Sequence, residues 1–290
     1  MHIFYPDSVD RDLRYSQYDG KTFTFEVVDG NGPAIQNYEI PDRVRTASDV
    51  SISSACAITP AGVSVFYRDE SQGILLGATK RINTTKWAYE LIDGDRKTDN
   101  RSTGDVAFHL AAYVTKSTTH IIYDSVLVIN QKRDITSGEV RYATRSGISP
   151  DSWSYTTLDK AENGIPVAGF DVAIAPEKAG IRMVWIAAGT NSAPVPNQIR
   201  STFVGKTKDI ATATLDSYGT PGARLSLENG ELILNCEMRL CSMNLALPNN
   251  PIRLVTSLQT VEPGHGILIT VDKKRFLLAA LDRRIAFIAA

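Results

Sequence analysis

The feature that most constrains this chain is an order of four short strands that recurs along it. From Asp49 the runs DVSISSACAIT, VSVFYRDES, ILLGATKR and KWAYELID follow one another. The same order returns from Asp105 as DVAFHLAAYVT, THIIYDSVLVI, GEVRYATRS and SWSYTTLD, and again from Asp171. The starts at 49, 105 and 171 are 56 and 66 residues apart, and four strands at such a spacing are typical of a propeller blade.

The runs between turns predict an all-β fold. They are four to eight residues long, rich in Val, Ile, Tyr, Phe and Thr, and separated by Gly, Pro, Asn and Asp, while helical periodicity is nearly absent. The links are too short to hold crossover helices, so neighbouring strands are expected to be antiparallel.

The two ends of the chain carry partial copies of the unit. MHIFYPDSV, DLRYSQYDG and TFTFEVVDG resemble the second, third and fourth strands, whereas GILITVD, RFLLAAL and RRIAFIAA resemble the first, second and third. We therefore predict a single β-propeller domain over residues 1–290 that is closed by its N- and C-terminal strands. Its approximate blades are 1–30, 49–93, 105–159, 171–216, 223–258 and 266–290, the first and last being partial.

Two closures fit this count. In a five-bladed ring, GILITVD completes the N-terminal blade and the last hairpin is an appendage; in a six-bladed ring, each terminal blade lacks one strand. Six blades are favoured because every match to the second strand is then used. Either ring must close, since an open sheet edge promotes aggregation.

The repeat also resembles a known group of proteins. HIIYD, a turn, GEVRYATRSG, Trp153 and the closing Leu158-Asp159 resemble the repeat of β-propellers related in architecture to sialidases and to fungal fucose-binding lectins. Sialidase Asp-boxes place Ser, Asp, Gly and Thr at a fixed spacing before a Trp, whereas Asp151 stands only two residues before Trp153, so the resemblance implies architecture and no catalytic residue. The fucose lectins carry an Arg in the second strand, which Arg182 resembles.

Composition and charge exclude several classes of function. The chain has 31 Lys and Arg against 32 Asp and Glu, and no block of like charge, so no basic surface for nucleic acid is expected. The N-terminus MHIFYPDSVDRDLRYS lacks the pattern of a signal peptide, and no run approaches the 18 apolar residues of a membrane span. These features predict a soluble chain, located in the cytoplasm or assembled in a particle.

No cofactor or metal site is predicted. The four histidines, His2, His109, His120 and His265, show no ligand spacing, and the sequence has neither a nucleophile elbow nor a phosphate-binding glycine loop. The three cysteines are expected to be reduced and buried, because Cys236 and Cys241 have no neighbouring His and lie too close together for a zinc quartet.

Asp49, Asp105 and Asp171 are the candidate catalytic residues, because each opens an innermost strand in the motif Asp-Val. A glycosidase needs two carboxyl groups roughly 5 to 9 Å apart, which acids at equivalent sites of neighbouring blades can satisfy. The competing and favoured interpretation is that each Asp caps a turn by accepting backbone N–H groups.

A second set of candidates lies on the second strands. A sugar site combines an aromatic platform with polar groups, and the strand ends offer such chemistry. The ligand-binding candidates are Tyr67, Arg68, Asp69, Tyr123, Asp124, Arg182 and Trp185. Packing between blades is the alternative role for these aromatics, and it is the role expected for Trp87 and Trp153 on the outer strands.

The sequence therefore favours a non-catalytic recognition module with a lectin-like carbohydrate ligand. Two alternatives stay open: a structural or protein-interaction propeller in a viral particle or other large assembly, and a glycosidase that uses the repeated Asp residues.

Overall fold

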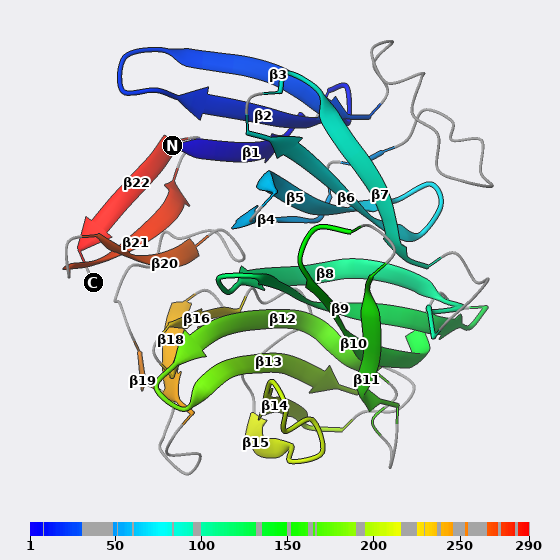
Figure 1. Cartoon of the computed structure of the whole chain (residues 1–290). Helices are drawn as coiled ribbons and strands as arrows, with labels where there is room; N and C mark the ends of the chain where they lie inside the picture. The colour runs from blue at the N-terminus through cyan, green and yellow to red at the C-terminus, as the bar shows by residue number, and fades with distance from the viewer. Residues whose placement is uncertain are drawn as a thin grey trace. The chain divides into compact units, whose positions relative to one another are not determined.

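The structure is a computed structural model that describes most of the 290 residues. Its description leaves out residues 8, 31–48, 51, 60, 83, 95–99, 132–134, 150–151, 162–164, 166, 190–194, 216–224, 229, 237–238, 246–252, 255–265, 272–273, 282–283 and 290. Side chains are also left out at 214–215, 235–236, 239–240 and in the strands after residue 252. The described residues form strands and no helix, which confirms the all-β prediction for this part of the chain (Figure 1).

The described strands form six sheets, and within each sheet they pair in sequence order. The first sheet contains β1 (His2–Pro6), β2 (Leu13–Tyr18) and β3 (Phe23–Asp29), and the second contains β4 (Ser54–Thr59), β5 (Gly62–Asp69), β6 (Ile74–Arg81) and β7 (Trp87–Asp93). The third contains β8 (Asp105–Val114), β9 (Thr118–Ile129), β10 (Ile135–Ser146) and β11 (Ser154–Lys160), and the fourth contains β12 (Val167–Glu177), β13 (Gly180–Ala188), β14 (Asn197–Phe203) and β15 (Ala211–Leu215). The fifth contains β16 (Ser226–Glu228), β17 (Glu231–Cys236), β18 (Arg239–Asn244) and β19 (Arg253–Leu254), and the sixth contains β20 (Gly266–Val271), β21 (Lys274–Leu281) and β22 (Arg284–Ala289). The recurring order of four strands is thus found as four-stranded antiparallel sheets.

The chain divides into two compact units. Unit 1 contains Met1–Val128 and Arg141–Thr157, and unit 2 contains Ile129–Val140 and Leu158–Ala290. The features described below each lie within one unit.

Strand β5 shows why these segments form sheets. In GVSVFYRD every residue except Val63 is buried, as expected for a strand covered on both faces and rich in β-branched and aromatic side chains. The turn that follows uses Gly73 at φ 66°, a left-handed conformation that favours glycine. A Cβ at Gly73 would also lie 2.2 Å from Oδ1 of Asp105, so the turn and the start of β8 are closely packed.

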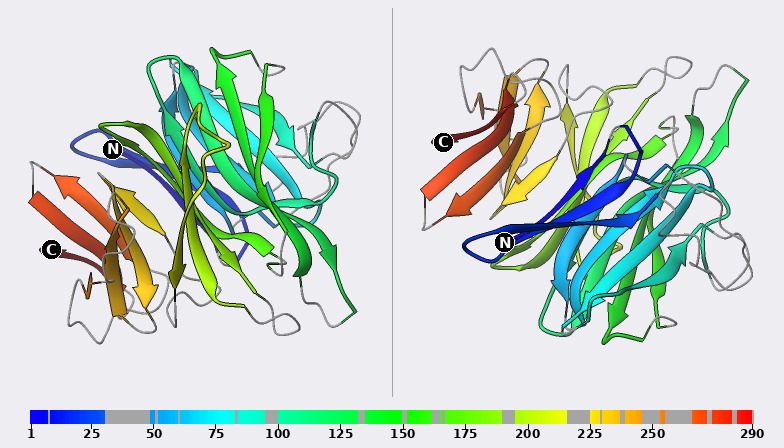
Figure 2. Two further views of the ribbon diagram at one scale, coloured as in Figure 1. Left: turned by 90° about the horizontal axis from the view of Figure 1, so that it is seen from below. Right: turned by 90° about the horizontal axis from the view of Figure 1, so that it is seen from above.

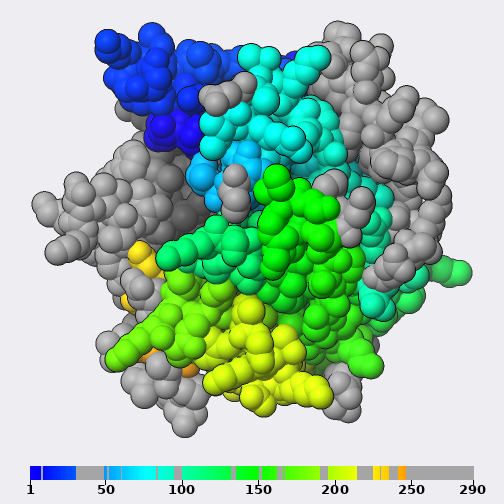
Figure 3. Space-filling model, in the orientation of Figure 1, coloured from blue at the N-terminus to red at the C-terminus, as the bar shows by residue number. Residues whose placement is uncertain are grey.

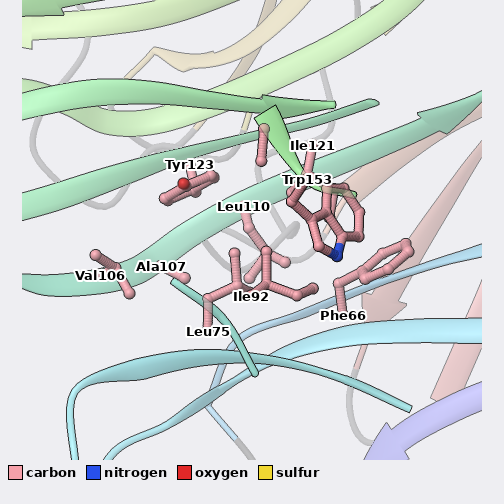
Figure 4. Packing of buried hydrophobic residues seen from close by; sticks show 10 residues of the cluster. Phe66, Leu75, Ile92, Val106, Ala107, Leu110, Ile121, Tyr123 and Trp153 are labelled. Atoms are coloured by element: carbon pink, nitrogen blue, oxygen red, sulfur yellow. The ribbon is translucent and has the colours of Figure 1, made fainter. Parts of the chain in front are cut away.

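Apolar side chains fill the space between neighbouring sheets of unit 1. Leu13, Tyr15 and Val28 of the first sheet pack against β5 and β6 of the second. The ribbons of these two sheets, coloured blue and cyan, lie side by side in Figure 2. The next core joins the second and third sheets, and its side chains are drawn in Figure 4: Phe66, Leu75, Ile92, Val106, Ala107, Leu110, Ile121, Tyr123, Ala143 and Trp153. In unit 2, a third core joins β13 and β14 to β17 and β18.

A polar cluster built around Glu26 links the first two sheets. The Nε1–H of Trp87 donates to Glu26 at 3.2 Å, and the ammonium of Lys80 also pairs with Glu26. Tyr89, two residues after the tryptophan, donates its hydroxyl to the carbonyl of Val28 at 2.5 Å.

The same cluster recurs around Glu90, between the second and third sheets. Trp153 donates to Glu90 at 3.1 Å, Arg145 donates to both of its carboxylate oxygens at 2.6 and 2.7 Å, and Tyr155 donates to the carbonyl of Ile92 at 2.5 Å. The packing role predicted for the two tryptophans is confirmed, and their indole N–H groups add a hydrogen bond to the neighbouring sheet.

Candidate functional site at the β8 bulge

Strand β8 contains a β-bulge that changes the direction of two side chains. Its pairing with β9 shifts between Val106 and Leu110, so the ladder skips Ala107, Phe108 and His109. Ala107 has φ 63°, a strained conformation for a residue with a Cβ. Bulges of this kind are frequent beside functional sites, where they direct side chains out of the regular ladder. Here they leave Phe108 and His109 partly exposed.

Arg68 of β5 supports one side of the bulge. Its side chain is only 2% exposed, one guanidinium nitrogen donates to the carbonyl of Val106 at 2.5 Å, and the guanidinium carbon lies 3.6 Å from the centre of the Phe108 ring. Its Nε pairs with Glu70, whose side chain is 34% exposed. The buried charge is therefore compensated by a carboxylate, a carbonyl and an aromatic face, while Glu70 extends toward solvent.

Asp124 of β9 supports the other side. Its carboxylate accepts the backbone N–H of His109 at 2.9 Å and lies 3.0 Å from His109 Nδ1. Asp124 is almost fully buried, whereas the side chain of His109 is 21% exposed. A carboxylate beside Nδ1 favours the tautomer with its proton on that nitrogen, and it fixes the orientation of the ring.

Strand β12, in unit 2, contains an equivalent bulge. Its register with β13 shifts in the same way, and Gly169 at φ 97° stands where β8 has Ala107. Leu110 and Val172, the first paired residues after the two bulges, each lie opposite the aromatic residue of the second strand. The bulge is therefore a repeated structural feature of the first strand.

The polar groups of the two bulges differ. Asp171 occupies the position of His109, and its carboxylate accepts the N–H groups of Val172 at 2.8 Å and Leu225 at 2.5 Å. Asp171 therefore caps backbone, as the favoured interpretation of the sequence predicts. Phe170 occupies the position of Phe108, so the phenyl ring is common to both bulges and the oriented imidazole of His109 is specific to β8. This break in the repeat is where we place the candidate site.

The structure corrects the expectation that the three candidate acids are equivalent. Asp105 lies before its bulge, whereas Asp171 lies inside its own, so the shared Asp-Val motif does not mark one position of the repeat. Asp49 lies 3.7 Å from Arg11, and its carbonyl accepts the N–H of Glu70. The physical reason is that both strands carry the same bulge but the Asp-Val dipeptide falls before it in β8 and within it in β12, where the carboxylate accepts backbone N–H groups.

The predicted aromatic platform is buried. Tyr67, Tyr123 and Trp185 are each 0% exposed, so none offers a ring face to a ligand in this structure. Each instead donates to a buried Asp at the end of the preceding sheet: Tyr67 to Asp29, Tyr123 to Asp93 and Trp185 to Asp159, all at 2.6 Å. Burial raises the pKa of Tyr123 well above its usual value, which keeps its hydroxyl protonated as a donor.

The remaining predicted residues are also held by protein groups. Arg182 donates to Glu177 at 2.6 Å and lies 4.3 Å from the centre of the Phe203 ring. Asp69 is fully buried and accepts the N–H of Gln72 at 3.1 Å in the turn after β5. Of the seven candidate ligand residues, the structure brings only Arg68 and Asp124 to the β8 bulge, where they position their neighbours.

Sequence reasoning missed Glu70, Phe108 and His109 as site residues. The signal that points to Phe108 and His109 is the loss of strict alternation in DVAFHLAAYV, where the adjacent Val106 and Ala107 are both buried and the adjacent Phe108 and His109 are both partly exposed. The connections at 94–104, 130–137 and 189–198 are longer than a hairpin needs, so the sequence also predicts binding residues there. They fall partly outside the described residues, at 95–99, 132–134 and 190–194.

Metal-binding and cysteine chemistry give no further site. The described residues contain no group of three or more His, Cys, Asp or Glu side chains that could hold a metal ion. Cys56 is free and exposed, whereas the sequence predicts a buried thiol. Cys241 is disulfide-bonded, so the prediction that it is reduced is wrong, and the side chain of Cys236 lies outside the described part.

Comparisons of the sequence identify no relative. No family model matches the chain, and no curated protein matches it. In the described part, no helix is both long and apolar enough to cross a membrane.

Comparisons of the structure do find related folds. A puromycin hydrolase mutant complexed with PGG matches 100% of this chain and 45% of its own at 12% identity, with a TM-score of 0.55. An ancestral GH74 enzyme matches 96% of this chain and 37% of its own at 10% identity, with a TM-score of 0.56. A sialidase from Trypanosoma rangeli matches 81% of this chain and 44% of its own at 14% identity, with a TM-score of 0.51.

This chain thus spans less than half the length of these structures, and the likeness concerns the fold alone. It agrees with the sialidase-like architecture expected from the repeat. The chain is an all-β protein of four-stranded antiparallel sheets with propeller-fold neighbours.

Proposed function

We propose that this chain is a non-catalytic recognition module that binds a carbohydrate at the β8 bulge. The observation that carries the proposal is the pair of partly exposed side chains, Phe108 and His109, held in a strained bulge by the buried Arg68 and Asp124. Strain of this kind persists only where the surroundings enforce it, and it is common at ligand sites.

The chemistry of the bulge suits a sugar. A pyranose presents an apolar face, which packs on an aromatic ring, and hydroxyl groups, which need fixed donors and acceptors. Phe108 supplies the ring, while His109 and the exposed part of Glu70 supply polar groups. Asp124 and Arg68 act as positioning residues because they are buried against the protein.

The architecture that we infer around this site is one closed propeller of six blades. Among the described strands, β20 pairs with β21 and β1 pairs with β2, in separate sheets. This arrangement favours six blades over five, because a five-bladed closure would place β20 beside β1. Propeller-fold neighbours support the propeller architecture.

A glycan array probed with the full chain tests the function. We expect binding to one class of glycan, and a loss of at least about tenfold in affinity for His109→Ala, since a hydrogen bond and its orientation in the site are lost. Asp124→Asn should weaken binding less, because the amide keeps its size and can accept one of the two hydrogen bonds to His109.

The matched control is His2→Ala, which removes a histidine from a different sheet and should leave glycan binding unchanged. Thermal unfolding of each variant separates lost binding from lost folding. An array without any hit, or His109→Ala binding as well as the parent chain, would contradict the proposal.

A further inference from the structure

Strand β1 lies at the edge of its described sheet, whereas its counterparts β5, β9 and β13 each lie between two strands. β5, β9 and β13 each pair on one side with a first strand, β4, β8 and β12, and on the other with a third strand. β1 pairs with β2, and within the described strands none pairs with its other edge. The contacts of this sheet identify it as strands two to four of the repeat, because Asp29 at the end of β3 accepts the hydroxyl of Tyr67 just as Asp93 accepts that of Tyr123.

The direction of the backbone groups on β1 follows from its pairing. The carbonyl of Met1 accepts the N–H of Tyr18, and the N–H of Asp7 donates to Asp12, so odd-numbered residues point their backbone groups at β2. The N–H and C=O groups of His2 and Phe4 and the carbonyl of Pro6 therefore point away from β2. In Figure 3 the side chains of this sheet, coloured blue, form part of the surface.

The position of Pro6 agrees with this assignment. Pro6 stands where the second sheet has Arg68, whose N–H donates at 3.1 Å to the carbonyl of Ser53, the residue just before β4. A proline has no N–H to donate, and within sheets it is found where that group would face an open edge. Pro6 thus ends a short ladder and leaves His2 and Phe4 as the pairing positions.

The other sheets show which residue fits opposite these positions. The counterparts of Phe4 are Phe66, Ile122 and Val184, and the residues paired with them are all alanines: Ala55, Ala111 and Ala173. The residues paired with the counterparts of His2 are Ala57, Tyr113 and Ala175. A small side chain is required opposite Phe4, because its ring already packs 5.0 Å from Tyr15 and 5.9 Å from Trp87, measured between ring centres.

We propose that the open edge of β1 binds an extended segment of a partner protein as an added antiparallel strand. The segment carries alanine or another small residue opposite Phe4, whereas the position opposite His2 holds alanine or tyrosine in the other sheets. Main-chain hydrogen bonds supply affinity in such strand addition, and the alternate side chains supply specificity. The proposal is independent of the carbohydrate site, since β1 and the β8 bulge share no residue.

A peptide taken from the chain's own repeat is the probe. Residues 170–177, FDVAIAPE, form part of the first strand of the fourth sheet and place Ala173 and Ala175 opposite the counterparts of Phe4 and His2. We expect the fluorescently labelled peptide to bind the full chain in an anisotropy titration. N-methylation of Ala173 and Ala175 should weaken binding at least about tenfold, because two N–H groups that face β1 are lost.

Methylation of Ile174 provides the matched control. Its N–H points away from β1 in the proposed register, so this peptide should bind within about threefold of the parent. On the protein, His2→Pro should weaken binding by removing an outward N–H, whereas His2→Ala should not. Pro6→Ala should strengthen binding, because it adds a backbone N–H that points away from β2.

Three results would overturn the proposal. The first is no binding of the parent peptide up to its solubility limit. The second is equal binding of the two methylated peptides, which would place the peptide elsewhere on the chain. The third is a dimer of the chain, seen by light scattering, that the peptide dissociates, because this would assign the edge to a second copy of the chain.

Discussion

Two interfaces of unit 1 are built from equivalent residues in the same places, and they differ in the residue of the third strand that lies beside the buried aspartate. Between the first and second sheets, Asp29 accepts the hydroxyl of Tyr67 and the N–H of Gly30 at 2.8 Å. Between the second and third sheets, Asp93 accepts from Tyr123 and Gly94, and additionally from Ser102 N at 2.6 Å and from Arg141 Nε at 2.9 Å. Arg141 of β10 thus places a buried positive charge beside Asp93.

One residue of the third strand explains the difference. Leu76 lies opposite Tyr67, whereas in unit 2 Arg200 lies opposite Trp185 and donates to Asp159 at 2.8 Å. The runs LLGATK and VRYATR place Arg141 at the same point of the repeat. An arginine at this position adds a buried ion pair between sheets, whereas leucine adds apolar contact.

The clusters around Glu26 and Glu90 differ in how exposed their charged side chains are. Lys80 and Glu26 have side chains 20% and 29% exposed, whereas Arg145 and Glu90 have side chains 4% and 12% exposed. The cluster around Glu90 is therefore less exposed than the cluster around Glu26. Removing one partner should lower the free energy of unfolding more at Glu90. Four predictions test this comparison.

The largest effect is expected for Asp93→Ala compared with Asp29→Ala. Asp93→Ala leaves the buried Arg141 without its carboxylate, so the free energy of unfolding should fall by about 3–5 kcal/mol. Asp29→Ala removes the hydrogen bonds from Tyr67 and Gly30 at an interface where Leu76 takes the place of that arginine, and it should cost about 1–3 kcal/mol. Urea denaturation of both variants measures the difference. Equal losses would show that the arginine adds nothing to the interface.

Arg141→Leu should make the second interface resemble the first. Arg141 also donates to the carbonyl of Asn100, so its loss should lower the free energy of unfolding by roughly 2–3 kcal/mol, less than Asp93→Ala. The double variant with Asp93→Ala should cost less than the sum of the two single changes, because the pair is removed as a unit. Additive losses in this double-mutant cycle would refute a direct interaction.

Much of this fold is visible in the sequence, because it depends on local patterns. Alternation, β-branched residues and turn glycines predict the strands, and the repeat predicts their order. The packing role of Trp87 and Trp153 follows from their equivalent places on outer strands, and the structure adds their bonds to Glu26 and Glu90.

The candidate site is harder to predict from the sequence, because it depends on an irregularity in the pairing of strand β8. The bulges in β8 and β12 cannot be located from the sequence pattern, so the shared Asp-Val dipeptide makes Asp105 and Asp171 look equivalent although they lie at different positions relative to their bulges. Tyr67 and Trp185 look like ligand platforms because burial depends on the neighbouring sheet, which a single strand does not reveal.

Glu90→Gln and Glu26→Gln provide a smaller contrast. Each amide keeps the shape of the side chain but removes the charge opposite a base. We expect a cost of about 2 kcal/mol at Glu90, whose partner Arg145 is nearly buried, and less than about 1 kcal/mol at the more exposed Glu26. High salt should reduce the stability contributed by Glu26 more than that of Glu90, since exposed pairs are screened. A reversed order in urea denaturation would show that exposure does not set the strength of these clusters.

The smallest effect concerns a histidine–tyrosine pair that also occurs twice. His120 Nδ1 lies 2.5 Å from the Tyr142 hydroxyl in the third sheet, and His2 Nδ1 lies 2.6 Å from that of Tyr15 in the first. Burial lowers the pKa of both histidines, and the charge of the amino terminus adds to the effect at His2.

A lowered histidine pKa makes stability depend on pH in one direction. Below about pH 6.5 the unfolded imidazole binds a proton that the folded one does not, so the stabilisation is complete above that pH and is lost as the pH falls toward the folded pKa. His120→Gln should therefore flatten the decline in unfolding free energy between pH 7.5 and pH 5, measured by urea denaturation at each pH. His2→Gln should flatten it less, because His2 is exposed and His120 is 5% exposed. The same change in slope for both variants would show that burial of the ring does not govern this pair.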